Sequence, residues 1–175
     1  MKKILVCVSL LFCFAYLNAN DHITFCGVDV YGDPVAFKQQ LIDKGFESEK
    51  GLPLMGEFLG EEVMVAFLQK TDSNTSSECI VGVVAIEFPS HNWDTIETKY
   101  RNCVDRVTKE YGSPTEVIWD VADGKDPKRE LVKERATIYT KFEKNNGEIV
   151  VEIKKMPLLG MTVFITIVDK ENMAK

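Results

Sequence analysis

The chain has few of the residues and motifs that identify enzymes and nucleic-acid-binding proteins. Its only two histidines, His22 and His91, lie far apart in the sequence and do not have a metal-ligand spacing. It contains no Gly-x-Ser-x-Gly nucleophile motif and no glycine-rich phosphate loop. Its 21 basic residues are outnumbered by 27 acidic ones, which disfavours binding to nucleic acid or to an anionic membrane surface.

Long hydrophobic runs are also scarce, and the one present is at the N-terminus. Two lysines precede an apolar run from Ile4 to Leu17, and Ala19 ends a plausible cleavage site. This is the layout of a secretory signal peptide, and the run is shorter than the roughly 20 residues of a membrane span. We therefore expect residues 1–19 to be removed and the protein to be periplasmic or extracellular, without a stable membrane anchor. The alternatives are a retained anchor and a lipoprotein acylated at Cys13.

The expected mature chain, residues 20–175, has 19 basic and 27 acidic residues, a net charge of −8. Its length fits a single domain with a substantial core. Three cysteines remain, Cys26, Cys79 and Cys103. An odd number leaves at least one thiol unpaired within the chain, although export permits a disulfide. We expect them to be buried small side chains at strand or helix positions, and the sequence leaves open whether two of them pair.

The first half of the mature chain, residues 20–89, predicts an extended arm, a helix and then strands. Residues 22–30 alternate like a short strand. Asp33 and Pro34 begin a helix that ends at Gly45. Two strong strands over 62–69 and 79–88 follow, joined by the polar loop 70–78, and Gly82 marks a possible bulge.

The second half, residues 90–175, predicts a longer helix and about four strands. Ser90 or Asn92 caps a helix whose apolar residues recur at three- and four-residue steps as far as Tyr111. Strands are expected over 115–121, 135–143, 147–153 and 160–168, with a charged loop over 122–130. A tight hairpin centred on Asn146-Gly147 joins the middle pair.

This order predicts an α+β fold in which two tandem helix-plus-antiparallel-sheet units, about 20–89 and 90–175, form a single compact domain. The helices are expected to pack on one face of the sheet, each on its own unit. Both alternating sets of the strand that starts near Val63 are apolar, so we expect it to be covered on both faces. The second cover is expected to be the other half of the chain, with another chain or a ligand as alternatives.

Candidate sites for chemistry are weak. Asp120, Asp123 and Asp126 lie near a glycine, but their spacing and the position of Glu130 do not match a calcium loop, so we expect a solvated acidic loop. Cys79 or Cys103 could pair with His91 in a hydrolase, yet no neighbouring residue would orient the imidazole. We therefore nominate no catalytic, cofactor-binding or metal-binding residue, and no cofactor.

Three stretches carry a resemblance: CGVDVYGDPVAFKQQLIDKGF, GEFLGEEVMVAFL and WDTIETKYRNCVDRVTKEYGSPTEV. Together they resemble a group of uncharacterised exported proteins of Bacteroides-type bacteria, although one extra residue separates the lysine and tyrosine of the exit motif. These are turn, cap and core motifs, so the resemblance implies a fold and no activity. The tandem layout is also similar to the β-lactamase inhibitor protein, whose two repeats form one sheet surface that grips a partner.

The sequence thus favours a non-catalytic, exported binding module that uses its sheet surface. Its partner is expected to be another envelope or secreted protein or a peptide, and the oligomeric state stays open. The alternatives are a carrier of a small apolar ligand and a hydrolase with an unrecognised site.

Overall fold

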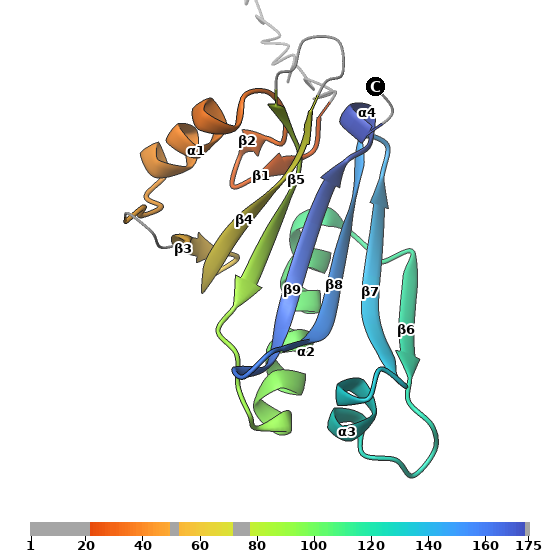
Figure 1. Cartoon of the computed structure of the whole chain (residues 1–175). Coiled ribbons are helices and arrows are strands. Elements are labelled where there is room, and N and C mark those ends of the chain that lie inside the picture. Colours follow the sequence, from red (N-terminus) through yellow and green to blue (C-terminus); the bar gives the residue numbers. More distant parts are fainter. Residues whose placement is uncertain (1–21, 50–52, 72–77, 174–175) are drawn as a thin grey trace, which may run out of the picture.

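The computed structural model describes residues 22–49, 53–71 and 78–173 (Figure 1). The chain combines four helices and nine strands within these ranges, which confirms the α+β class. The expected signal peptide and most of the polar loop 70–78 lie outside the described residues. Within the described ranges, no helix combines the length and the apolar character needed to cross a membrane.

The N-terminal arm is a small hairpin of β1 (Thr24–Phe25) and β2 (Val28–Asp29). Cys26 and Gly27 form its turn, with φ angles of 51° and 70°. The expectation that Cys26 occupies a strand or helix position was therefore wrong. Glycine adopts this left-handed backbone without strain, and its presence beside Cys26 is the local turn signal.

Helix α1 (Pro34–Asp43) has the two ends that the sequence predicts. The Asp33 carboxylate accepts a hydrogen bond from the Ala36 backbone N–H at 2.8 Å, and Pro34 needs no partner at the first helical position. Gly45 follows the helix with φ 99°. Phe37 and Leu41 are buried, so this short helix contributes to the core despite its largely polar surface.

Helix α2 (Trp93–Tyr111) is the longest helix of the described chain. Of the two predicted caps, Asn92 is the N-cap, and its side chain accepts from the Thr95 backbone N–H. The predicted helical spacing is confirmed, because the buried residues form one stripe: Ile96, Tyr100, Cys103 and Val107. Gly112, with φ 90°, ends the helix.

The large sheet has seven strands in the order β3-β4-β5-β9-β8-β7-β6, and every neighbouring pair is antiparallel. The strands are β3 (Leu54–Phe58), β4 (Glu61–Thr71), β5 (Glu78–Glu87), β6 (Glu116–Asp120), β7 (Thr137–Lys144), β8 (Gly147–Met156) and β9 (Gly160–Asp169).

The two halves of the chain join edge to edge within this sheet. The last strand, β9, pairs with β5 along Gly82–Ile86, so the helices share one sheet and do not each have a separate one. This corrects the expected arrangement of the strands. The pairing satisfies backbone groups that two separate sheets would leave as additional open edges.

Two local expectations need smaller corrections. The β7–β8 hairpin turns at Asn145-Asn146, one residue earlier than predicted, and Gly147 is already the first residue of β8. A glycine is needed there because a Cβ would lie 2.5 Å from the Val168 carbonyl oxygen. The bulge near Gly82 is confirmed, since the β4–β5 register shifts at this point.

Part of the predicted charged loop 122–130 is helical. Helix α3 (Pro127–Val132) begins at the cap Asp126, whose carboxylate accepts from the Lys128 backbone N–H at 3.0 Å. The signal is the same Asp-Pro pair that begins α1, and its high density of charged neighbours concealed it. The C-terminal helix α4 (Lys170–Met173) is a single turn.

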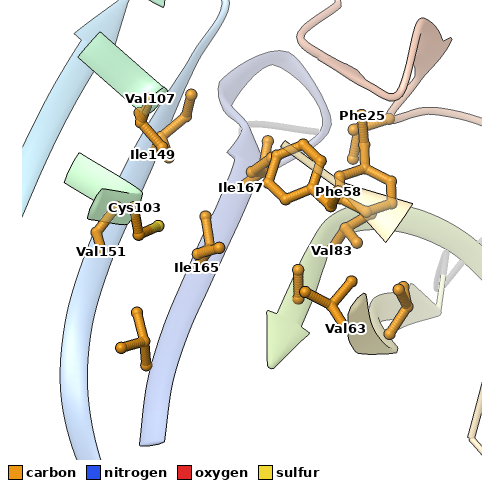
Figure 2. Close-up of a cluster of buried hydrophobic side chains, with 14 of the residues drawn as sticks. Phe25, Phe58, Val63, Val83, Cys103, Val107, Ile149, Val151, Ile165 and Ile167 are labelled. Atoms are coloured by element: carbon orange, nitrogen blue, oxygen red, sulfur yellow. The ribbon is translucent and has the colours of Figure 1, made fainter. Parts of the chain in front are cut away.

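One hydrophobic core extends across both halves (Figure 2). In the close-up, Val107 of α2 lies by Ile149 of β8 at one side, while Phe25 and Phe58 lie together at the other. Ile165 of β9 lies between these groups. The two halves therefore contribute to one core, and the strand β9 connects its two parts.

Candidate functional site: the uncovered face of the sheet

The candidate site is the face of the sheet opposite the core. The strand registers place Met55, Met64, Ile86 and Phe164 in one transverse row across β3, β4, β5 and β9. Side chains alternate between the two faces of a strand, so the neighbours Val63, Val65 and Ile165 point to the core. We call the opposite side, where Met64 and Phe164 lie, the uncovered face.

This face has a continuous apolar patch. The second row contains Ala66, Val84, Thr166 and Val150, and the third contains Leu68, Gly82 and Val168. Neither helix α1 nor helix α2 packs here. Figure 1 shows α2 behind β8 and β9, on the far side of the sheet.

The patch remains partly open to solvent. None of its side chains is buried by another described segment, and Leu68 is 37% exposed. We define the apolar patch by these members: Met55, Met64, Ala66, Leu68, Val84, Ile86, Val150, Phe164, Thr166 and Val168. The other half of the chain therefore does not provide the second cover expected for these strands, because the halves meet at their edges and not face to face. Cover by another chain or by a ligand stays a prediction. A patch that spans several strands is unusual on an isolated soluble chain and is typical of an interaction site.

The flank of the patch on β7 and β8 is charged but largely neutralised. Lys141 forms ion pairs with Glu143 at 3.0 Å and Glu148 at 3.2 Å, and these two carboxylates raise its pKa to about 12. Lys154 pairs with Glu152 in the same region. Of these pairs, Lys141–Glu148 joins β7 to β8 and the other two lie within one strand. Together they keep the β7–β8 side polar and limit the apolar patch to the rest of the sheet.

The opposite flank, at β3, is acidic and not neutralised by a described cation. Glu57 and Glu62 are direct partners across β3 and β4, and Glu47 is bridged to Met55. All three carboxylates are exposed and form no ion pair with a described lysine or arginine. Glu47, Glu57 and Glu62, which we call the acidic edge, line a shallow hollow of about 310 Å³ together with Met55.

Sequence reasoning did not find the acidic edge. The available signal was the pair of glutamates around the Leu59-Gly60 turn, which places Glu57 and Glu62 opposite each other if the turn has two residues. Glu47 could not have been found, since it joins the edge only through its bridge to β3.

The residues considered for a hydrolase are not brought together. Cys79 is the second residue of β5 and His91 follows the other end of this strand, and the strand from Cys79 to Glu87 alone spans about 26 Å at the usual rise per residue. Cys103 lies ten residues into α2, about 15 Å from the end nearest His91. Cys103 is also buried, and desolvation raises its pKa far above that of an ordinary thiol. A thiol in this setting stays protonated and is a poor nucleophile.

The other two cysteines are half-buried rather than fully buried, and all three are free thiols. Cys26 is desolvated enough that its pKa rises to about 11, although the positive charge of Lys44 opposes this effect. No disulfide therefore links these three cysteines in the described structure. The prediction of buried apolar thiols is confirmed fully only for Cys103.

The aspartates of the 122–130 segment have structural roles or lie in solvent. Asp126 caps α3, and Glu130 is paired with Arg135 at 2.8 Å. Within the described ranges, no group of three or more histidine, cysteine, aspartate or glutamate side chains is arranged to hold a metal ion.

A second polar cluster lies on the core side of the sheet, beneath α2. Glu87 is 2% exposed, and its Oε2 has no hydrogen-bond partner among the described residues. Lys99 Nζ is 3.7 Å from this oxygen, while Arg106 of the same helix is paired with Glu61 of β4 at 2.6 Å. Burial is the largest effect on the Glu87 carboxyl group and raises its pKa to about 6. The negative charge of Glu61 adds to this increase, whereas the positive charges of Lys99 and Arg106 oppose it.

The space between α2 and the sheet is filled by side chains. Ile96, Cys103 and Val107 are at most 2% exposed and belong to the same core as Ile149 and Ile165. Figure 2 shows Cys103 and Val107 of α2 beside Val151 and Ile149 of β8. The region where a carrier would hold an apolar ligand is therefore occupied by the protein itself.

The comparisons with known proteins add no relative: no family model, no curated protein and no solved structure matches the chain.

Proposed function

We propose that the protein is an exported, non-catalytic interaction module that binds a partner protein or peptide through the apolar patch on the uncovered face. The observation that carries this proposal is the register of β4, β5 and β9, which aligns two rows of mainly apolar side chains on a face that neither α1 nor α2 covers. Desolvating such a patch against a partner gives a favourable free energy of about 25 cal/mol per Å² of apolar surface.

The layout of the chain supports the same proposal. We propose two tandem units, about residues 20–89 and 90–175, with α1 packed beside β5 in the first and α2 against β8 and β9 in the second. The inhibitor-protein-like arrangement is proposed at the level of architecture only, since a fold does not determine a function. In this arrangement α1 and α2 take one face and leave the apolar patch available on the other.

A site-specific crosslinking experiment in the native host tests this function. A photoreactive benzoylphenylalanine replaces Thr166, which is at the centre of the patch, and in a control it replaces Asp105, which is exposed on α2. We expect a discrete crosslinked partner from position 166 and none from position 105. Adding Ile86→Glu should remove the adduct, because a carboxylate then occupies the middle of the apolar row.

The partner is then identified by mass spectrometry, purified and titrated with the wild-type protein and with Ile86→Glu. Equal adducts from positions 105 and 166, or binding that Ile86→Glu leaves unchanged, would contradict the proposal. Circular dichroism of each variant confirms that the fold is intact.

A further inference from the structure

The acidic edge suggests which chemistry the partner carries. Glu57 and Glu62 face each other directly across β3 and β4, and like charges in this position destabilise a strand pair. No described lysine or arginine is paired with either carboxylate. A cation bound between them would relieve this repulsion.

Glu47, which comes from a different segment of the chain, adds a third carboxylate to the same edge. Its bridge to Met55 puts it in line with the first apolar row, which continues through Met64 and Ile86. The hollow of about 310 Å³ at this edge is therefore lined by three carboxylates and opens beside an apolar side chain. A lysine or arginine side chain has this combination of properties, with an apolar stem and a cationic end.

The flank on β7 and β8 differs from the acidic edge because its carboxylates are neutralised by ion pairs. Its carboxylates already have cations, since Glu143 and Glu148 share Lys141 and Glu152 pairs with Lys154. The unneutralised charge is thus concentrated on one side of the apolar patch. This asymmetry gives a partner a preferred orientation as well as a preferred charge.

From these contacts we infer that the partner surface is a cationic amphipathic segment of another protein, with apolar side chains on the apolar patch and lysine or arginine over the acidic edge. This inference rests on the proposed function. It disfavours a second copy of this chain placed face to face, because that would bring like-charged surfaces together. It also disfavours an anionic membrane for the same reason.

A matched peptide series tests the inference with residues 20–175 of the protein. Three amphipathic 18-residue peptides share one leucine stripe and differ only in the flanking residue, which is lysine, glutamine or glutamate. Binding is measured by fluorescence anisotropy at two salt concentrations. We expect the lysine peptide to bind most tightly and the glutamate peptide most weakly, and the affinity of the lysine peptide to fall with salt.

The decisive variant is Glu57→Gln combined with Glu62→Gln. We expect this variant to bind the lysine peptide about fivefold more weakly and with a smaller salt dependence, and to bind the glutamine peptide with unchanged affinity. The matched control, Glu110→Gln with Glu134→Gln, makes the same change in net charge at exposed positions away from the patch. In the free protein, the Glu57 and Glu62 variant should also unfold at a higher urea concentration, because the repulsion across β3 and β4 is removed.

The outcomes separate this inference from the proposed function. Equal weakening by both double variants, or no preference for lysine over glutamate, overturns the cationic partner. If Ile86→Glu then still abolishes the crosslink from position 166, the binding function stands and only the inferred chemistry of the partner fails. If the crosslink is absent as well, both fail.

Discussion

Replacing the buried Glu87 by glutamine should stabilise the protein at neutral pH and have little effect in acid. Burial raises the pKa of this carboxyl group from its ordinary value of 4.5 to about 6. Well below pH 4.5 the group is protonated in the folded and the unfolded chain, and the folded state carries no penalty. Between pH 4.5 and pH 6 the unfolded chain loses this proton while the folded chain keeps it, so the free energy of unfolding falls through this window and levels off above pH 6, where both states are ionised.

The size of the effect follows from the difference between the two pKa values. At about 1.4 kcal/mol per pH unit, ionisation of Glu87 lowers the free energy of unfolding by about 2 kcal/mol between pH 4 and pH 7.5. This loss already includes the attraction of Lys99, at 3.7 Å, so we expect Glu87→Gln to gain about 1 to 2 kcal/mol at pH 7.5. The matched control is Glu110→Gln, which removes an exposed carboxylate from the same helix that covers Glu87.

Urea unfolding at half-unit steps from pH 4 to pH 8, followed by tryptophan fluorescence and circular dichroism, measures the difference. The curves of the wild type and Glu87→Gln should converge in acid, separate between about pH 4.5 and pH 6 and keep a constant difference above that, while Glu110→Gln follows the wild type. Parallel curves over the whole range would refute the reasoning, because they would mean that the Glu87 carboxylate is not desolvated in the folded protein.

Two further predictions concern buried positions elsewhere in the core. Iodoacetamide should leave Cys103 unmodified in the native protein at pH 8 and alkylate it in urea, because burial keeps the thiol protonated. Peptide mass mapping measures the modification, and rapid labelling of Cys103 in the native protein would contradict its burial between α2 and the sheet. Gly147→Ala should lower the free energy of unfolding by about 2 kcal/mol or more, since the new Cβ would lie 2.5 Å from the Val168 carbonyl oxygen. The control Gly124→Ala, at φ 69° with no atom within 4 Å, should cost about 1 kcal/mol in the same urea titration, and equal costs would argue against the close contact.

Local chemistry explains why the helices were predictable. The caps Asp33 and Asn92 and the terminators Gly45 and Gly112 act within a few residues of the chain, so their effect can be read from neighbouring sequence alone. Helix α3 has the same kind of start at Asp126, and it was missed because it lacks a strong apolar stripe.

The candidate site was only partly predictable for a related reason. The apolar residues at alternate positions of β4, such as Met64 and Leu68, predicted that this second face needs a cover. Whether the cover comes from the same chain depends on how β5 and β9 pair, and these strands are about eighty residues apart.

By itself, the sequence determined the α+β class, helices α1 and α2 with their ends, and most of the strands, because caps, glycines and alternating apolar residues act over a few positions. Only the tertiary structure decided that the halves join through β5 and β9, that Glu87 lies beneath α2, and that Glu47, Glu57 and Glu62 gather at one edge. These features depend on strand register and on contacts between distant segments. Local propensity does not specify such contacts, whereas the free energy of packing the whole chain does.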